Sequence, residues 1–235
     1  MYVVKRDGTR EPVSFDKITE RLRQLCALPP AISSANVDAT AVAQEVVAGI
    51  CPGITTAQLD TLASETAAYM STVHPDYGTL AARIAVSNHH KQTSPNFVDA
   101  MRQAYEYRTR QTHELAPMLD AEFMACVERN GAAIELAIRH ERDYMFEYFG
   151  FKTLRHKYLL ETEDEQPIER PQYLFMRVAL WLHGDDLPAV FETYTLLSTH
   201  VMMHATPTLF NAGTERSQCS SCFLLRMQEV RRMRT

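Results

Sequence analysis

Two cysteines near the C-terminal end of the chain are the residues best suited to redox or metal chemistry. Cys219 and Cys222 form a C-x-x-C motif that precedes the apolar residues 223–225. A structural zinc site needs further Cys or His ligands at a suitable spacing, and the sequence has no second pair of this kind. A thioredoxin-like motif follows a strand and opens a helix, whereas this motif precedes a predicted strand. One redox thiol with a distant partner therefore remains open, and so does a pair of inert side chains.

A cluster of basic residues near the N-terminus could bind an anion. Lys5 and Arg6 precede the turn Asp7-Gly8, and Lys17 and Arg21 lie four residues apart, on one face of a predicted helix. A hairpin packed beside the start of that helix would bring together cations, backbone N–H groups and the positive end of a helix, which together can bind phosphate. The sequence contains neither of the glycine-rich phosphate-binding motifs. The cluster is therefore either an anion site or a solvated basic face.

Two histidines have the i, i+4 spacing that is common in metal-binding helices. His200 and His204 fall on a predicted helix, but Val201 occupies the position where metalloproteases carry Glu. Packing of this pair near Met202 and Met203 is the simpler interpretation.

The basic cluster must be positioned by a hairpin and the helices that follow it. Asp7-Gly8 lies between two short extended segments and predicts a tight turn. Asp16 is a suitable cap for the first helix, and Thr55 opens the capping-box pattern of the third. Apolar residues spaced by three and four predict helices over 16–25, 38–50, 55–70 and from 76 onward. Residues 1–95 are therefore predicted to form a module with its own core.

The remaining sequence is predicted to be mainly helical. Apolar periodicity predicts helices before residue 145 over 97–107, 120–130 and 132–139. Pro171 suits the first turn of another helix, and a last one begins at Asp186 and leads to His204. The aromatic run 144–151 is predicted to pack in a core, and the acidic segment 161–165 to form a solvated loop.

The composition excludes several classes of protein. Hydrophobic residues make up 46% and charged residues 23% of the 235 residues, which is typical of a globular chain. The net charge of −5 gives no electrostatic reason for binding nucleic acid or an anionic membrane. No segment approaches the ~20 apolar residues of a membrane span, and the N-terminus does not resemble a signal peptide. Five scattered cysteines do not form a secreted disulfide framework, so a reducing, cytoplasmic compartment is predicted.

Several long motifs, in order along the chain, resemble class I ribonucleotide reductases. Residues 3–9 and 15–18 resemble the start of the ATP-cone, the nucleotide-sensing module of these enzymes. The match to this module continues at 59–63, 74–77 and 81–88. Motifs similar to the helical N-terminal domain and first barrel strand of the large subunit lie at 148–154, 169–172 and 204–225.

The resemblance implies a mainly α fold in three parts. Residues 1–95 would be the ATP-cone, a β-hairpin with four helices, and residues 96–203 would be the helical N-terminal domain. Residues 204–235 would begin the ten-stranded α/β barrel that carries catalysis, of which only the first strand is matched.

The resemblance also implies functional residues. The family's allosteric ATP/dATP site corresponds here to Lys5, Arg6, Glu11, Pro12, Val13, Ser14, Phe15, Asp16, Lys17, Thr56, Asp60 and Lys91. Asp60, expected on a helix surface, would read the nucleotide. Thr206 and Ser221 correspond to contacts with the substrate, and Cys222 to one of the two cysteines that reduce the ribose. Cys219 matches no functional position, so the resemblance implies that the C-x-x-C spacing is accidental.

The implied activity is the reduction of ribonucleoside diphosphates to deoxyribonucleotides by a thiyl radical, under the control of ATP and dATP. A separate small subunit would hold the metal-radical cofactor, so no metal is expected in this chain. The implied partners are that small subunit, further large subunits, and thioredoxin or glutaredoxin as reductant.

The chain also departs from the family. Nothing after Leu225 matches it, and the thiyl cysteine and the disulfide partner of Cys222 have no counterpart. We therefore expect the 235-residue chain to be the N-terminal part of a reductase large subunit and to be inactive alone. The alternative is a truncated, non-catalytic module for ATP/dATP sensing or interaction. A zinc or dithiol redox protein, based only on Cys219 and Cys222, is a third hypothesis.

Overall fold

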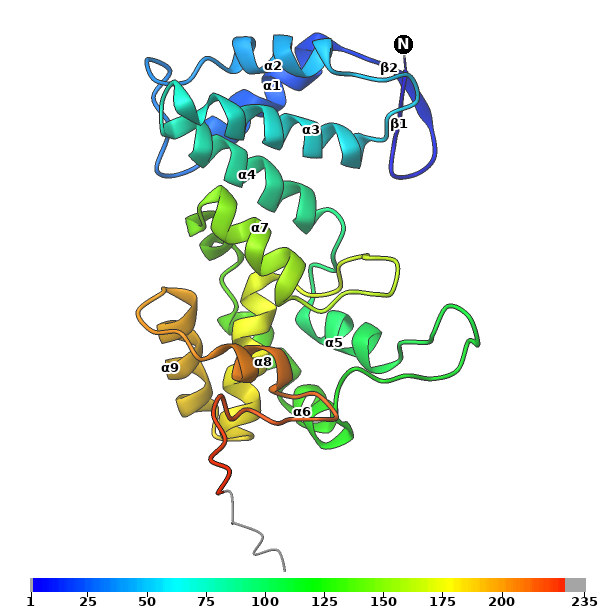
Figure 1. Cartoon of the computed structure of the whole chain (residues 1–235), viewed down its shortest axis with the longest axis vertical. Helices are drawn as coiled ribbons and strands as arrows, with labels where there is room; N and C mark the ends of the chain where they lie inside the picture. The colour runs from blue at the N-terminus through cyan, green and yellow to red at the C-terminus, as the bar shows by residue number, and fades with distance from the viewer. Residues whose placement is uncertain (1, 227–235) are drawn as a thin grey trace, which may run out of the picture.

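A small hairpin opens the chain in the computed structural model, which describes residues 2–226 (Figure 1). Strands β1 (Tyr2–Val4) and β2 (Arg10–Pro12) pair antiparallel. The turn between them uses Gly8 at a φ of +82°, which favours glycine, and the Asp7 carboxylate accepts the backbone N–H of Thr9 at 2.9 Å. The predicted hairpin is therefore confirmed.

The hairpin is followed by the predicted helices. They are α1 (Phe15–Cys26), α2 (Ala39–Ala48), α3 (Thr56–Tyr69) and α4 (Asp76–His90), with a 3-10 turn η1 (Met70–Thr72) between the last two. The capping box at Thr55 is present, with Gln58 as its partner. The cap of α1 differs from the prediction, because Ser14 accepts the N–H of Lys17 and Asp16 lies inside the first turn.

A hydrophobic core joins these helices. It is made from apolar positions of all four helices, among them Leu22, Val42, Ala67, Leu80 and Ile84. The hairpin is fixed to this bundle through the N–H of Val4, which donates to the carbonyl of Ile54 at 2.9 Å, immediately before α3. The turn of the hairpin is thereby held beside the start of α3.

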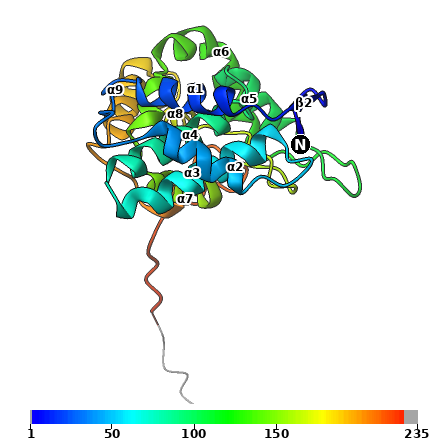
Figure 2. The same ribbon diagram turned by 90° about the horizontal axis from the view of Figure 1, so that it is seen from above.

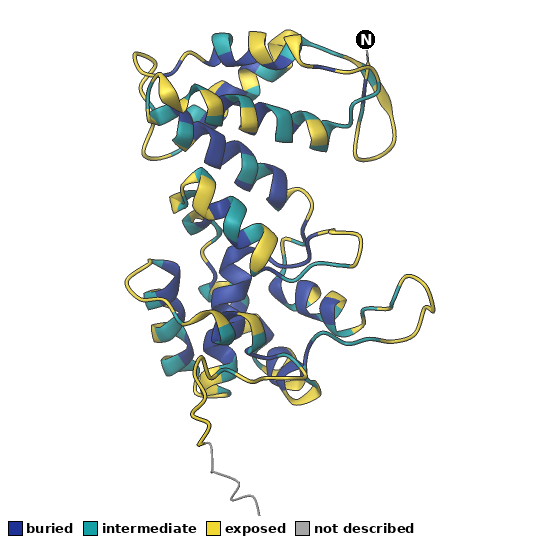
Figure 3. Cartoon of the chain, viewed as in Figure 1, coloured by how far each residue is buried: buried dark blue, intermediate teal, exposed yellow. Residues whose placement is uncertain are grey.

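A second body of helices lies below the first in Figure 1 and behind it in Figure 2. It has its own hydrophobic core. Its elements are α5 (Phe97–Tyr105), α6 (Ala121–Ala137), η2 (His140–Met145), α7 (Tyr148–Lys157), α8 (Pro171–His183), α9 (Leu187–Ser198) and α10 (Thr206–Asn211). Helix α8 lies at the centre and is buried over most of its length (Figure 3). Pro171 occupies its first turn, as predicted. Among the described residues, no helix is long and apolar enough to cross a membrane.

Two helix predictions in this body were wrong. Helix α6 is continuous where two helices were predicted on either side of Gly131. A Cβ at Gly131 would lie 2.8 Å from Cγ2 of Val98, so this glycine allows close packing rather than a break. The helix before His204 ends at Ser198, and His200 has a φ of +60°, so the two histidines do not share a helix.

The predictions for two further segments met mixed outcomes. In the aromatic run Phe151 is buried, but Phe149 is 82% exposed, so the run does not pack wholly in a core. The predicted barrel strand is not confirmed, because the described residues after α10 form no strand and Leu224 is fully exposed. A single strand without a neighbour cannot satisfy its backbone groups. Residues 227–235 of the predicted third part lie outside the described residues.

The two bodies meet along the C-terminal end of α4. Nε2 of His89 lies 2.9 Å from the carbonyl of Glu169, and Nε2 of His90 lies 2.6 Å from Oδ2 of Asp143. Arg170 donates to the carbonyl of His90 at 3.0 Å and to that of Thr93 at 3.1 Å. Polar groups of the second body therefore hold the last turn of α4.

Burial of His89 in this contact predicts a pH dependence of stability. Desolvation lowers the pKa of His89 from 6.5 to about 3, so below pH 6.5 the unfolded chain binds a proton that the folded chain does not. The free energy of unfolding should therefore fall as the pH drops. This single group should remove about 2 kcal/mol between pH 7 and pH 5.

Urea unfolding of His89→Gln at pH 7 and pH 5 measures this contribution. The variant should lose about 2 kcal/mol less than the wild type between the two pH values. His156→Gln, at an exposed position of α7, is the matched control and should follow the wild type. Equal pH dependence in His89→Gln and wild type would contradict the assignment.

Candidate functional site

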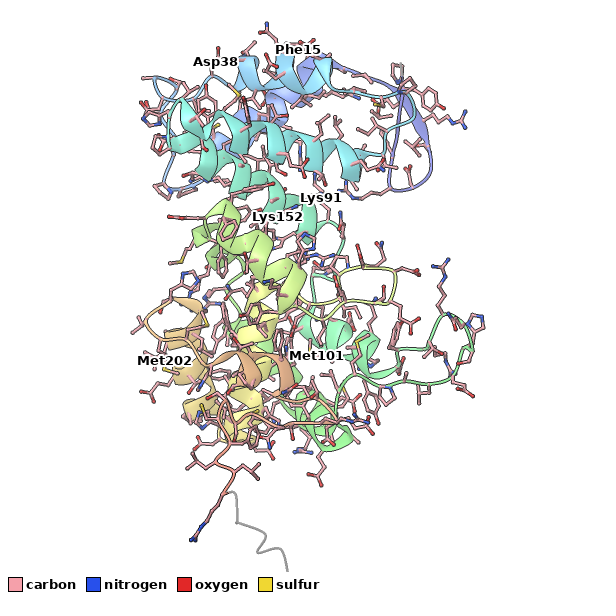
Figure 4. All side chains as sticks on the ribbon, viewed as in Figure 1. Phe15, Asp38, Lys91, Met101, Lys152 and Met202 are labelled. Carbon is pink, nitrogen blue, oxygen red and sulfur yellow. The ribbon has the colours of Figure 1, made fainter. Side chains whose placement is uncertain are left out.

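The hairpin, α1, α3 and α4 enclose a cavity of about 540 Å³. Residues from both strands, from the start of α1, from the first turns of α3 and from the end of α4 line it. They are Val3, Lys5, Arg6, Asp7, Glu11, Pro12, Val13, Ser14, Lys17, Ile18, Arg21, Thr56, Leu59, Asp60 and Lys91. Figure 4 labels Lys91 at the C-terminal end of α4.

Asp60 is the electrostatic centre of this cavity. Its Oδ1 lies 2.9 Å from Nε of Arg21, and its Oδ2 lies 3.4 Å from Arg6 and 3.5 Å from Nζ of Lys91. Burial lowers the pKa of Lys91, and the nearby Asp60 opposes that shift. One carboxylate therefore holds cations from the hairpin, α1 and α4 at one point.

Asp60 was expected on an open helix surface. It is instead only 7% exposed. The reason is that Arg6, Arg21 and Lys91 cover the face of α3 from which it projects. A helix periodicity argument cannot detect a surface that is covered by long charged side chains from other segments.

Glu11 links the two lysines at the opposite end of the cavity. Its carboxylate lies 2.5 Å from Nζ of Lys5 and also pairs with Lys17. In total the cavity is lined by five cationic side chains and three carboxylates, so its formal charge is +2. An anion with more than one negative charge can compete for these lysines.

The rest of the lining is apolar or belongs to a helix terminus. Val3, Val13, Ile18 and Leu59 provide an aliphatic wall. Ser14 caps the start of α1, where the helix dipole favours negative charge. The cavity therefore combines a surface for a planar apolar ring with a cationic surface for an anionic group.

Two segments of the chain match models of known protein families. Residues 1–92 match the family model described as the ATP cone domain, and residues 144–217 match that described as the ribonucleotide reductase all-alpha domain. The chain is therefore similar to the family of ribonucleotide reductase large subunits in both of these parts. The resemblance found in the sequence is thus confirmed.

Curated members of this family are similar to the chain over 97% of its length. The ribonucleoside-diphosphate reductase large subunit of Dictyostelium discoideum is 52% identical, and the chain covers 26% of it. Large chain 2 of Saccharomyces cerevisiae is 48% identical with 26% covered, and the large subunit of Caenorhabditis elegans is 50% identical with 28% covered. The chain thus spans about a quarter of the length of these relatives.

Most residues predicted for the nucleotide site of the ATP cone line the cavity. Phe15 and Asp16 do not, although both lie in the first turn of α1. The cavity also includes residues that the resemblance did not supply, namely Val3, Asp7, Ile18, Arg21 and Leu59. Helical spacing could have indicated Ile18 and Arg21, because positions 14, 17, 18 and 21 share a face of α1.

The residues predicted to act on a reductase substrate lie elsewhere. Thr206 opens α10, where its hydroxyl is 3.2 Å from that of Tyr158. Ser221 and Cys222 are exposed beside each other, with 3.9 Å between Oγ and Sγ. Cys219 is half-buried, and burial raises the pKa of its thiol. Within residues 2–226, no group of three or more metal-ligating side chains forms a cluster.

The position of Asp60 predicts an energetic cost for its replacement. Asp60→Asn keeps the shape of the side chain but leaves three neighbouring cations without their carboxylate. The free energy of unfolding should fall by about 1.5–3 kcal/mol, as expected for hydrogen bonds to charged groups. Glu65→Gln changes an exposed carboxylate on the same helix and should stay within about 0.5 kcal/mol of the wild type. Urea unfolding compares the two, and equal stabilities would refute the structural role of Asp60.

Proposed function

We propose that the cavity binds ATP and dATP as allosteric effectors, and that the chain is the regulatory N-terminal portion of a ribonucleoside-diphosphate reductase large subunit. The observation that carries this proposal is a cavity of +2 charge with an aliphatic wall, inside the segment that matches the ATP cone domain. Its volume of about 540 Å³ falls in the range of pockets for small molecules.

The proposed roles follow from the chemistry of the lining. Lys5 and Lys17 would exchange Glu11 for phosphate oxygens, assisted by the N-terminus of α1. Ile18 and Leu59 would contact the adenine ring. Asp60 would hold its cations in place and, through them, set the position of the sugar.

The remaining reductase functions are proposals from the family. In the complete protein, Thr206 and Ser221 would contact a ribonucleoside diphosphate, and Cys222 with a second cysteine would supply two electrons by closing to a disulfide. The C2′–O bond would break, and the hydroxyl would leave as water. The radical would come from a metal-containing small subunit, and thioredoxin or glutaredoxin would reduce the disulfide again. These partners, and self-association of large subunits, belong to this proposal.

We also propose the division into residues 1–95, 96–203 and 204–235. The ATP cone match and the first core support the first part, and the second core supports the next. A cytoplasmic location remains a proposal, supported by five free cysteines.

A second function is a non-catalytic sensor or interaction module for ATP and dATP. It is favoured by the contrast between the two predicted sites. Residues 3–91 alone line the nucleotide cavity, whereas Ser221 and Cys222 are exposed and lie outside it. Reductase assays with a small subunit, a ribonucleoside diphosphate and a reductant separate the two functions, because only the first requires turnover by the complete protein.

Calorimetric titration of the chain with ATP and with dATP tests the common basis of both functions. We expect saturable binding, and absence of binding at millimolar nucleotide would refute the proposal. Lys91→Met should weaken ATP binding by tenfold to about 150-fold, since it removes a charged partner worth about 1.5–3 kcal/mol. Lys157→Met, at an exposed position of α7, should bind like the wild type.

The environment of Asp60 further predicts an effect on nucleotide discrimination. Asp60→Asn should change the ratio of ATP to dATP affinity, because the cations that face the sugar lose their fixed carboxylate. Parallel titrations of wild type and variant measure the two ratios. The same ratio in both proteins would show that Asp60 does not read the nucleotide.

A further inference from the structure

The last turn of α4 has one face toward the nucleotide cavity. Asn88 and Lys91 are three residues apart and therefore project from the same side of the helix. Oδ1 of Asn88 accepts a hydrogen bond of 2.6 Å from Arg6, and Nδ2 of Asn88 donates to the carbonyl of Ala57 at 3.1 Å. Lys91 pairs with Asp60. This face therefore fixes two of the cations of the cavity.

The other face of the same turn is bound to the second body. His89 contacts the carbonyl of Glu169, and His90 contacts the carboxylate of Asp143. The side chain of Asp143 is fully buried at this contact. Asn88 and Lys91 thus contact side chains that line the cavity, whereas His89 and His90, between them in the sequence, contact the second body.

The contact of His90 continues into the centre of the second body. Nε2 of Gln172 donates to Oδ1 of Asp143 at 2.9 Å, and the hydroxyl of Tyr194 donates to Oε1 of Gln172 at 2.7 Å. This buried network connects α4 with η2, α8 and α9. A displacement of His90 would leave Oδ2 of the fully buried Asp143 without this partner, which is costly in a buried network.

The contact of His89 leads to a buried ion pair, because its partner Glu169 also binds Arg177. The side chain of Glu169 pairs with Arg177 at 2.7 Å, and both side chains are fully buried. Arg177 also donates to the carbonyl of Ala212 at 2.6 Å, just after α10. The anchors of α4 are therefore rigid points of the second body rather than surface contacts.

We propose that the last turn of α4, residues 88–91, couples occupancy of the nucleotide cavity to the position of η2 and the start of α8. The inference rests on the proposed function, because it assumes that an anionic nucleotide competes for Arg6 and Lys91. Such a ligand attracts Arg6 and Lys91 within the cavity while Asp60 continues to hold them, and this shifts the turn that carries His89 and His90 against its contacts with the second body. Asn88 and Asp143 act as positioning residues, and neither needs to touch the nucleotide.

The coupling must act in both directions. A substitution that weakens the contact of His90 with Asp143 should change the nucleotide affinity of the cavity. The factor is the same as that by which bound nucleotide changes the strength of this contact. Asp143→Asn removes one of the two acceptor oxygens that His90 and Gln172 require, and it leaves the cavity lining untouched. Glu141→Gln is the matched control, since Glu141 is an exposed carboxylate in the same 3-10 segment.

The first experiment is calorimetric titration of the whole chain with ATP. Asp143→Asn should lower the Kd by about fivefold or more, the lower range of allosteric coupling, because the weakened anchor no longer resists the displacement of the turn, while Glu141→Gln keeps the wild-type Kd. Thermal unfolding verifies that the variants are folded at the titration temperature. Tyr194→Phe, which deletes only a hydroxyl, serves as a milder variant and should lower the Kd by a smaller factor. Wild-type affinity in a folded Asp143→Asn would overturn the coupling.

The second experiment uses the unmodified chain, so no variant has to fold. Hydrogen exchange with and without ATP should show changed protection at residues 140–145 and 169–173, in addition to the cavity segments. Residues 108–114, an exposed loop of the second body, provide the internal control and should not change. Changes confined to the cavity would overturn the coupling while leaving the nucleotide site intact. No change anywhere, together with no heat of binding, would instead overturn the proposed function itself.

Discussion

One buried carboxylate organises the cavity between the hairpin, α1, α3 and α4. Asp60 attracts Arg6 from the hairpin, Arg21 from α1 and Lys91 from α4, and these segments are far apart in the sequence. Without it, like charges at this short range would repel one another and separate the elements that carry them. The cavity therefore has its shape because the cations are held against their mutual repulsion. The same arrangement leaves positive charge unneutralised, which is what an anionic ligand requires.

The second constraint is that α4 belongs to two environments. Its middle packs in the core of the first four helices, through Leu80 and Ile84, whereas its end is held by hydrogen bonds from η2 and α8. A helix transmits displacement along its axis because its backbone hydrogen bonds resist local distortion. The cone and the second body are therefore joined by a stiff element rather than a flexible linker.

Local signals were sufficient for much of the fold, and the family resemblance named most of the residues that line the cavity. Asp7-Gly8 predicted the hairpin and Thr55 the start of α3, because turn and capping chemistry depend on neighbouring residues. The contacts that make the site depend on packing between distant segments. Sequence alone therefore gave neither the burial of Asp60 nor the role of Asn88 in holding Arg6. Gly131 was misread for a related reason, since its purpose is the approach of Val98 from another helix.

The two ends of the cavity should respond differently to salt. The bridge of Glu11 with Lys5 and Lys17 is exposed, with the Lys17 side chain 67% accessible, whereas Asp60 retains only 9% of its side-chain accessibility. At the ionic strength of a cell the screening length is about 8 Å, so mobile ions weaken the exposed bridge far more than the buried cluster. Phosphate binding by the lysines would then vary with ionic strength, while the geometry around the sugar would stay constant. Affinity and selectivity would thus be set at different ends of one cavity.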